Sequence, residues 1–276
     1  MKTETNREEL LKILPGYENY PTFSDFLPAG EEESGHYVMR FARTLEDLDG
    51  IFQLRYEVFN LELNEGLDAS HTTGRDQDQF DPGCHHLIIA DKRTDEIIGT
   101  YRMQRREMAK AAHGFYSAGE FQLNMLPDEV LDQSVELGRA CVALDHRNGR
   151  VLFLLWRGVI KYLQFNGKRY LFGCSSLTSQ DPAEGKRMMN HLTRKGNVHE
   201  EHEVLPQPDY VCYDDSVVVE ENASVKVPRL MRLYLTYGVK VCGPPAIDRE
   251  FKTIDYLVLL DIENSNKQFR KLLLDE

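Results

Sequence analysis

The feature that most constrains the fold is a pair of apolar runs joined by a short polar link. His86–Ala90 and Glu96–Gln104 flank the polar residues Lys92–Asp95. Two such runs around a tight polar connection predict a β-hairpin. Further strands are expected where apolar runs recur, at His36–Arg43, Val135–Ala143, Arg169–Leu177, Val239–Cys242, Ala246–Ile247 and Tyr256–Leu260.

Helical patterns separate these strands. Thr44-Leu-Glu-Asp47 resembles a capping box, and the apolar stripe from Leu48 to Leu61 has helical spacing. Val151–Phe165 is an apolar helix, and Val227–Tyr237 is followed by Gly238, as a C-terminal glycine cap would be. A hairpin flanked by crossover helices predicts an α/β (α+β) fold, with a mixed, mostly antiparallel central sheet and helices on both of its faces.

The chain divides into an N-terminal extension and one large domain. Residues 1–35 are expected to form this extension, with a short helix at Glu8–Leu14, and the charge cluster at Glu31–Glu33 is expected to be a plain linker. Residues 36–276 form the domain, and its irregular part, about 181–225, is expected to be an insertion that begins with a helix at Pro182–Lys195.

Composition narrows the class of protein. The net charge of -12 argues against binding nucleic acid across a broad surface, which requires a dominant basic field. The five cysteines form no CxxC pair and suit buried thiols in a reducing cytoplasm. The charged N-terminus is unlike a signal peptide, and no apolar run has transmembrane length. A cytoplasmic protein is expected, in which any membrane contact would be peripheral.

Charged residues interrupt the apolar strands. Glu136-Leu-Gly-Arg139 lies inside the strand at Val135–Val142, Arg102 ends the second hairpin strand, and Arg55 lies on the first helix. Buried charges are rarely left unpaired, so a carboxylate–arginine network that only holds the fold is one interpretation. Strand alternation separates Glu136 from Arg139 unless a bulge near Gly138 re-aims the arginine.

Other kinds of catalytic site find little support. Gly-x-Ser-x-Gly, GxGxxG and GxxxxGK[ST] are absent. His199-Glu-Glu-His202 is not HExxH, and two histidines in a polar run are expected to be solvated, so no metal and no cofactor are predicted.

Read together, these segments resemble a known family. The chain is similar to the acyl-homoserine-lactone synthases, and closer to the ornithine-acyl-carrier-protein N-acyltransferases, the hemolysin-like GNAT proteins. The resemblance covers roughly residues 37–262, in the family's order. It rests on Leu54-Arg-Tyr-Glu-Val-Phe59, Asp78-Gln-Phe-Asp81, His86-Leu, Gly99-Thr-Tyr-Arg102, Phe115-Tyr-Ser117, Glu120-Phe121, Glu136-Leu-Gly-Arg-Ala-Cys-Val142, Leu155-Trp156, Phe172-Gly-Cys-Ser-Ser176 and Pro245-Ala-Ile-Asp248.

The resemblance implies a GNAT fold whose sheet splays to admit an acyl thioester, carried by an acyl carrier protein or by coenzyme A. The phosphate loop of acetyltransferases corresponds here to His146-Arg-Asn-Gly-Arg-Val151, which lacks the full spacing and fits the single phosphate of a pantetheine arm better than coenzyme A. The expected donor-binding residues are Cys141, Val142, Arg147, Gly149, Arg150 and Trp156. A basic patch for an acidic carrier protein would comprise Arg147, Arg150, Arg157, Lys161, Lys168 and Arg169.

The implied reaction assigns roles to the charged strand residues. An amine attacks a thioester only as the neutral base, and an α-amine has a pKa near ~8. Glu136 is expected to take the proton, oriented by Arg139 or Arg102, while a strand N–H at Cys141 or Val142 binds the oxyanion. The expected acceptor residues are Arg55, Phe59, Asp78, Asp81, Ser175 and Ser176, and an acyl tunnel is expected along Phe153, Leu154, Trp156 and Tyr170.

The leading hypothesis is therefore an N-acyltransferase that moves a fatty acyl group from a carrier thioester to a small amino acid such as ornithine or glycine. An autoinducer synthase shares the charge pattern but requires S-adenosylmethionine, and Pro244-Pro-Ala-Ile-Asp248 fits it poorly. A GNAT-fold binding or lytic protein without catalysis is the third alternative.

Overall fold

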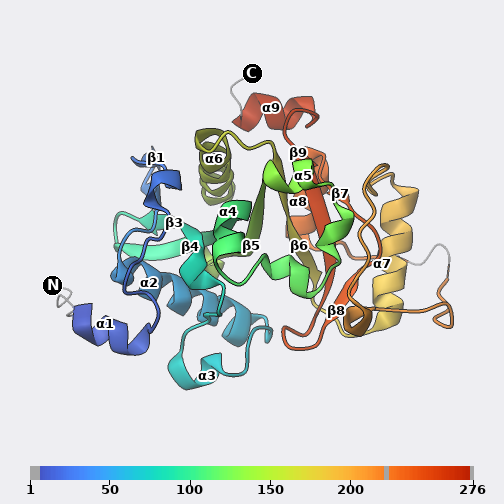
Figure 1. Ribbon diagram of the computed structural model, residues 1–276, viewed down its shortest axis with the longest axis horizontal. Helices are drawn as coiled ribbons and strands as arrows, with labels where there is room; N and C mark the ends of the chain where they lie inside the picture. The colour runs from blue at the N-terminus through green and yellow to red at the C-terminus, as the bar shows by residue number, and fades with distance from the viewer. Residues whose placement is uncertain (1–6, 221–223, 274–276) are drawn as a thin grey trace. The chain divides into compact units, whose positions relative to one another are not determined.

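The computed structural model describes residues 7–220 and 224–273, and they form two compact units. The first unit comprises Met1–Gly114 and Leu137–Gly167, and the second comprises Phe115–Glu136 and Lys168–Glu276. Strand β5 (Ser134–Val142) supplies its first three residues to the second unit and the remainder to the first. Figure 1 labels the helices and strands of the chain.

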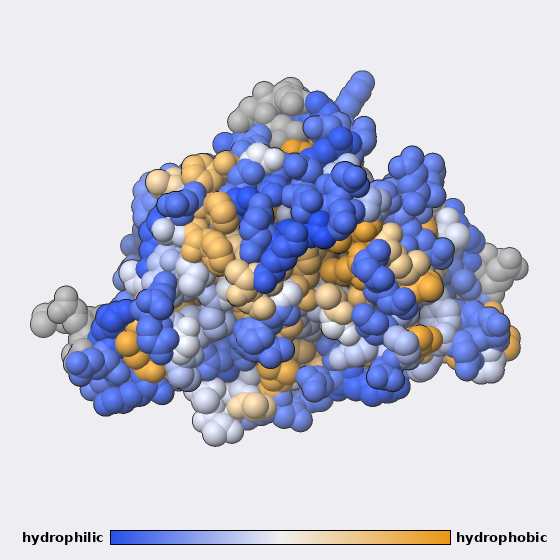
Figure 2. All heavy atoms as spheres, in the orientation of Figure 1, coloured by the Kyte–Doolittle hydropathy of each residue, from blue (hydrophilic) through white to orange (hydrophobic). Residues whose placement is uncertain are grey.

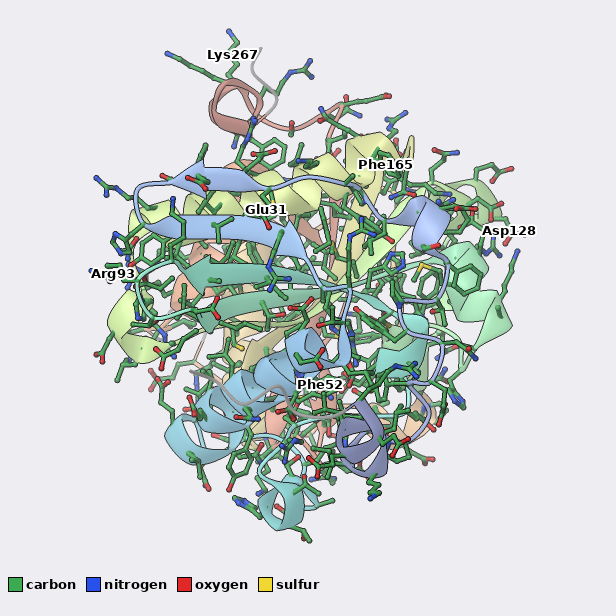
Figure 3. The ribbon with its side chains drawn as sticks, turned by 90° about the vertical axis from the view of Figure 1, so that its left-hand side faces the viewer. Glu31, Phe52, Arg93, Asp128, Phe165 and Lys267 are labelled. Carbon is green, nitrogen blue, oxygen red and sulfur yellow. The ribbon has the colours of Figure 1, made fainter. Side chains whose placement is uncertain are left out.

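The first unit is built on antiparallel strands. β1 (Glu32–Ser34), β2 (Tyr37–Phe41), β3 (His85–Asp91) and β4 (Glu96–Arg105) pair in this order, and β4 is followed by the C-terminal part of β5. Figure 3 shows β1 to β4 side by side, with the helix that carries Phe52 lying along them. The expected hairpin is therefore confirmed as β3 and β4.

Helices cover both faces of this sheet. Val38 and Ile88 pack in one apolar cluster with α2 (Leu45–Arg55), whereas their neighbours Met39 and Leu87 face α6 (Gly149–Phe165). A Cβ at Gly158 would lie 2.5 Å from Leu87 Cδ1, so the glycine permits the close approach of α6. The alternation of strand side chains thus supplies both helices with an apolar surface.

The capping box expected at the start of α2 is confirmed. Thr44 Oγ1 accepts from the N–H of Asp47, and Asp47 Oδ2 accepts from the N–H of Thr44. α2 continues as a π-helical segment, Tyr56–Glu62, and such segments are frequent at functional sites. The unit also contains α1 (Arg7–Ile13), α3 (Ser70–Thr73) and α4 (Arg106–Ala111).

The plain linker expected at Glu31–Glu33 is wrong, because this segment leads into a strand, and the described part of the N-terminal extension packs within the first unit. Leu10, Leu14 and Tyr17 are buried in the same cluster as α2, and Glu32–Ser34 pairs with β2 as strand β1. This strand could not be predicted from its charged residues, because a segment this polar becomes extended only when it pairs with a neighbouring strand.

The second unit is a smaller mixed sheet. β6 (Tyr170–Leu177) pairs in parallel with Ser134–Glu136 and antiparallel with β9 (Thr253–Asp261), which also pairs with β7 (Lys240–Val241) and β8 (Ala246–Asp248). α7 (Pro182–Arg194) packs on β9, where Tyr256 donates to the carbonyl of Gly185 at 2.9 Å. The remaining helices are α5 (Asp128–Asp132), α8 (Arg229–Tyr237) and α9 (Lys267–Leu273).

The expected fold class is confirmed: β1 to β4 pair antiparallel, β6, β7 and β8 each pair antiparallel with β9, and β5 pairs in parallel with β6. The expected helix at Pro182–Lys195 and the glycine cap of α8 are also present, with Gly238 at φ 95°. Over the described ranges, no helix combines the length and hydropathy needed to cross a membrane. Polar side chains cover most of the face in Figure 2, and they separate small apolar patches.

Candidate functional site

One face of the second unit's sheet collects polar side chains. Glu136 pairs with Phe172, and Cys174 and Ser176 follow Phe172 on the same face because strand side chains alternate. Ser176 lies opposite Asp255 on β9, and Thr253, two residues earlier, lies opposite Asp248 on β8. The register of four strand segments therefore places three carboxylates on one face, which we call the acidic face.

Glu136 is fixed by the turn that covers this face. Its Oε1 accepts from Ser117 N at 2.8 Å and from Ser117 Oγ at 2.6 Å, and its Oε2 accepts from Tyr116 N at 3.0 Å. The carboxylate is 6% exposed, and Phe115 packs edge-on against Phe172 beside it. Glu136 is thus a buried carboxylate whose orientation is set by its hydrogen-bond donors.

A second group of carboxyls lies on the same face. Glu120, Asp248 and Asp255 are all buried, and one oxygen from each lies within 4.8 Å of those of the other two. Asp248 Oδ1 accepts from the N–H groups of Glu250 and Phe251, and its Oδ2 accepts from the Tyr116 hydroxyl at 3.2 Å. We call these three residues the acidic triad.

The triad is not fully satisfied by the protein. Glu120 Oε1 and Asp255 Oδ1 are buried and accept no hydrogen bond from an N–H or hydroxyl group of the described residues, although Thr253 Oγ1 donates to Asp255 Oδ2 at 3.0 Å and the Glu120 and Asp255 carboxyls hydrogen-bond each other. Burial and the neighbouring carboxylates raise the pKa of Glu120 well above its usual range, and burial raises the pKa of Asp255 to about 6. An anionic cluster of this kind can hold a proton or another cation.

Cys174 and Ser176 connect the parts of the acidic face. Cys174 Sγ lies 3.5 Å from Ser117 Oγ and 3.8 Å from Glu120 Oε2. Ser176 is exposed and hydrogen-bonds Asp255, so solvent reaches the triad's edge there. Ser175 is buried on the opposite face, so the two serines predicted to bind substrate cannot share that role.

The remaining charged residues of the prediction form a network inside the first unit. Arg55 is fully buried; it contacts Asp76 Oδ1 at 2.6 Å and Asp81 Oδ1 at 2.8 Å. Arg102 reaches Asp81 at 3.0 Å and Asp78 at 2.7 Å. Arg55 and Asp81 form an ion pair with each other. To bind substrate, either side chain would have to break that ion pair and bind the substrate instead.

The break expected in β5 is present one residue after Gly138. Arg139 has φ 50°, in the left-handed region, which interrupts the extended strand. Its guanidinium then donates to Asp78 Oδ2 at 2.8 Å. Arg102 and Arg139 therefore meet at Asp78 in the first unit, whereas Glu136 belongs to the second unit.

Charge balance in this network stabilises its ionised carboxylates. Burial acts to raise the pKa of Asp81, but Arg55 and Arg102 outweigh it and hold that pKa well below the usual range. The pKa of Asp78 is lowered in the same way, chiefly by Arg102 against burial. Burial lowers the pKa of His86 to about 4, so its imidazole is neutral at pH 7.

The predicted phosphate loop opens α6, but its backbone donors are already used. Asn148 Oδ1 accepts from the N–H groups of Arg150 and Val151, as an N-cap does. A surface hollow of about 430 Å³ lies here, lined by His36, Tyr37, Asn148, Gly149 and Arg150. No described atom lies within 4 Å of a Cβ added at Gly149, so the backbone there is open to approach.

The basic residues expected around this loop are mostly neutralised by carboxylates. Arg147 binds Glu62 with two 2.5 Å hydrogen bonds, and Arg157 and Lys161 both approach Glu32. Arg150 makes no ion pair with any residue in the described part of the chain, which leaves it as the cation facing the hollow.

The other donor and acceptor predictions fall in apolar surroundings. Cys141 is buried with Leu54 and Val58, and Phe59 packs against the same cluster; burial raises the pKa of the Cys141 thiol to about 12. Val142 is half-buried, and its carbonyl accepts from Arg147. Trp156 is 2% exposed within α6, a position typical of core packing.

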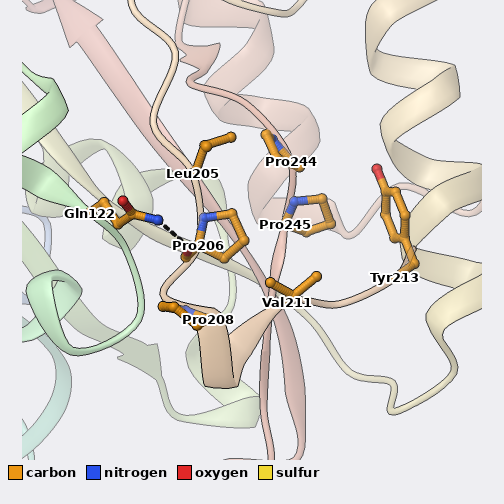
Figure 4. A pocket seen from close by; sticks show the side chains of 8 residues that line it. All are labelled: Gln122, Leu205, Pro206, Pro208, Val211, Tyr213, Pro244 and Pro245. Carbon is orange, nitrogen blue, oxygen red and sulfur yellow. Dashed lines mark hydrogen bonds between the residues drawn. The ribbon is translucent and has the colours of Figure 1, made fainter. Parts of the chain in front are cut away.

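An apolar hollow of about 370 Å³ also lies in the second unit (Figure 4). Gln122 Nε2 donates to the Pro206 carbonyl at its edge. The other lining residues are Leu205, Pro208, Val211, Tyr213, Pro244 and Pro245.

Sequence reasoning missed the acidic triad as a group. Glu120 and Asp248 lie in segments that carry the family resemblance, but no catalytic or binding role was predicted for them. Asp255 is an acidic residue inside the apolar run of β9, which is the signal that could have indicated it. His199 and His202 instead stack on one another, and His199 Nδ1 accepts from two backbone N–H groups. Within the described residues, the acidic triad is the group whose ligand atoms lie close enough together to hold a metal ion or another cation.

Comparison with known proteins identifies relatives of this chain. A family model for the acetyltransferase (GNAT) domain matches residues 54–157. The L-ornithine N(alpha)-acyltransferase of Rhizobium meliloti is 31% identical over 81% of this chain and 79% of its own length. The enzyme of the same name from Brucella abortus is 30% identical over 85% of this chain and 88% of its own.

Solved structures also match at low identity. An N-acyl amino acid synthase from uncultured soil microbes has a TM-score of 0.49 at 10% identity, and the match covers 87% of this chain and 97% of that one.

Proposed function

This chain belongs to the L-ornithine N(alpha)-acyltransferase family and carries its GNAT domain, and from that premise we propose that it transfers a fatty acyl group from a pantetheine thioester to the α-amine of ornithine. The family makes it an N-acyltransferase that acts on an amino acid. The observation that carries the choice of ornithine is the 31% identity, over most of both chains, to an enzyme of that name.

Glu136 is the proposed general base. It is buried, and three donors from Tyr116 and Ser117 hold it in one orientation, which suits a group that must meet a reacting atom in a fixed geometry. The neutral α-amine attacks the thioester carbonyl, the C–N bond forms, and Glu136 accepts the proton directly or through water. The C–S bond then breaks, and the proton passes to the leaving thiolate.

Arg102 and Arg139 act through Asp78 in this proposal. Both guanidiniums bind that carboxylate, and Arg139 does so from the break in β5. They are positioning residues that fix the strand on which the oxyanion donor, Cys141 N or Val142 N, is expected. The thioester supplies the activation, so the reaction requires no cofactor.

The donor is proposed to be an acyl carrier protein rather than coenzyme A. The hollow at the start of α6 offers one arginine, Arg150, because the N–H groups of Arg150 and Val151 already donate to Asn148. That provision suits one phosphate better than the pyrophosphate of coenzyme A. A product that enters lipid synthesis would bring the protein to the membrane surface peripherally, from the cytoplasm.

The test is an acylation assay with the full chain. Purified protein is supplied with palmitoyl carrier protein or palmitoyl coenzyme A and with ornithine, glycine or S-adenosylmethionine, and products are identified by mass spectrometry. We expect Nα-acylornithine from the carrier thioester. Product only with S-adenosylmethionine would establish the autoinducer alternative, and no product with any combination would refute acyl transfer as proposed.

A further inference from the structure

We propose that the acidic triad of Glu120, Asp248 and Asp255 binds the side-chain ammonium of the amino-acid acceptor, and so selects a diamino acid over a monoamino acid. This inference rests on the proposed function and names the group that recognises its substrate. None of the three residues has a role in the reaction described above.

The first support is geometric. The three carboxyls converge within 4.8 Å, although Glu120 lies in a loop that is distant in sequence from the neighbouring strands β8 and β9, which carry Asp248 and Asp255. Each of them is at least 95% buried. Three acidic groups gathered away from water repel one another, so such a cluster is stable only when a cation or protons neutralise it.

The second support is the unsatisfied hydrogen-bonding capacity inside the cluster. Glu120 Oε1 and Asp255 Oδ1 are buried oxygens that receive no hydrogen bond from an N–H or hydroxyl group of the described residues, and each residue is 3% exposed. Without ligand the Glu120 and Asp255 carboxyls hydrogen-bond each other, so Glu120 holds a proton that a bound ammonium would replace. Leaving such an acceptor unpaired is unfavourable, and a primary ammonium carries three N–H donors. The third carboxylate, that of Asp248, is fixed by the Tyr116 hydroxyl and by the N–H groups of Glu250 and Phe251. The site is therefore formed before ligand binds.

The two amines of ornithine, the α-amine and the terminal amine, differ in whether they must lose a proton, and this difference indicates which of them binds the acidic triad. The reacting α-amine must lose its proton, and three carboxylates would stabilise its ammonium form and raise its pKa. The terminal amine of ornithine takes no part in the reaction and stays charged. The triad is therefore suited to the terminal amine, which does not react. The single carboxylate of Glu136 is suited to the α-amine, which does.

The two carboxylate sites are connected within the second unit. Ser117 donates to Glu136, and Cys174 lies between Ser117 and Glu120. Tyr116, whose N–H holds Glu136, donates from its hydroxyl to Asp248. One turn thus holds both the proposed base and the proposed ammonium site, as an acceptor with two amines requires.

The test measures discrimination between two acceptors. Norvaline matches ornithine in chain length and lacks the terminal amine. We expect kcat/KM for ornithine to exceed that for norvaline by about 100-fold, and Asp248→Asn and Asp255→Asn to reduce this ratio by about 100-fold. Asn keeps an acceptor oxygen for Glu250 N and Phe251 N, so Asp248→Asn preserves the local backbone.

Asp209→Asn is the matched control, because Asp209 is an exposed acid of the same unit. It is expected to leave the ornithine-to-norvaline ratio unchanged. If the triad variants lower both activities equally, the triad is structural and the inference is wrong while acyl transfer stands. A wild type that does not distinguish ornithine from norvaline also overturns it.

A binding measurement separates this inference from the acyltransferase proposal. Ornithine, norvaline, MgCl₂ and CaCl₂ are titrated calorimetrically into wild type and Asp255→Asn without acyl donor. Ornithine binding that is weakened about 100-fold in the variant, with no comparable loss for norvaline, supports the ammonium site even if no donor is accepted. Binding of Mg²⁺ or Ca²⁺ that depends on Asp255, without an ornithine effect, would assign the triad to a metal ion instead.

Discussion

Ser117 donates two hydrogen bonds to the same oxygen of Glu136, from its backbone N–H at 2.8 Å and from its hydroxyl at 2.6 Å. Two donors on one acceptor restrict both the position of the carboxylate and the direction of its free lone pairs. The relationship also ties a strand residue to a turn residue that lies 19 positions earlier in the sequence. Glu136 is accordingly held by the protein before any substrate binds.

Replacement of this carboxylate is predicted to abolish most of the acyl transfer. Glu136→Gln removes the proposed base, so kcat is expected to fall by ~10² to 10⁴-fold, measured with acyl carrier protein and ornithine. Ser117→Ala is the control: it removes one donor but leaves the carboxylate and both backbone donors, so kcat is expected to fall by less than about 10-fold. Glu136→Gln with wild-type kcat would remove Glu136 from the mechanism.

The buried ion network of the first unit is predicted to govern stability. Asp81→Asn leaves Arg55 and Arg102 each short of a carboxylate in a buried site, and the free energy of unfolding is expected to fall by about 3–5 kcal/mol. Urea unfolding measures the change. Glu33→Gln, which breaks the exposed pair with Lys92, should alter it by less than about 1 kcal/mol. Equal effects of the two variants would show that burial does not strengthen the network.

Removing Asp255 as a titrating group is predicted to change how the free energy of unfolding depends on pH. Its pKa is about 6 in the folded protein and 3.8 in the reference state, so the folded protein binds more protons between these values. That contribution to stability is complete below pH 3.8 and is lost as pH rises through 6. By linkage the loss amounts to about 3 kcal/mol.

Asp255→Asn should therefore gain about 3 kcal/mol relative to wild type between pH 4 and pH 7. The predicted quantity is the difference in unfolding free energy between variant and wild type. This is because His85 and His86, whose pKa values are lowered to about 4, make both proteins more stable as pH rises. Thermal unfolding across this range measures it, with Asp209→Asn as a variant expected to show no pH-dependent difference. A constant offset between Asp255→Asn and wild type would contradict the assignment.

Arg150 is predicted to contribute to donor binding alone. Arg150→Gln should raise KM for the acyl carrier protein about 10-fold and change kcat little, because a phosphate contact far from the reacting atoms is made equally in the ground and transition states. Lys110→Gln, an exposed charge removed elsewhere in the first unit, is the control for net charge. An unchanged KM for Arg150→Gln would place the phosphate away from the hollow at α6.

Local patterns determined most of the secondary structure. The capping box at Thr44, the hairpin of β3 and β4 and the glycine cap after α8 depend on residues close in sequence, and all were predictable. β1 was not, because a polar segment such as Glu32–Ser34 becomes a strand only through its partner β2. The importance of Glu136, Arg139, Arg102 and Arg55 could likewise be inferred, since charges inside apolar elements need partners.

The partners themselves were decided by tertiary structure. Nothing in the spacing of Arg139 fixes its pairing with Asp78, which depends on the positive φ at that residue. Asp255 and Ser176 face one another only because β6 and β9 pair in that register, and a shift of one residue would turn both away. The sequence by itself indicated that Glu136, Arg139, Arg102 and Arg55 would need charged or polar partners. Register and backbone conformation, which arise from contacts between distant segments, specified which of them meet.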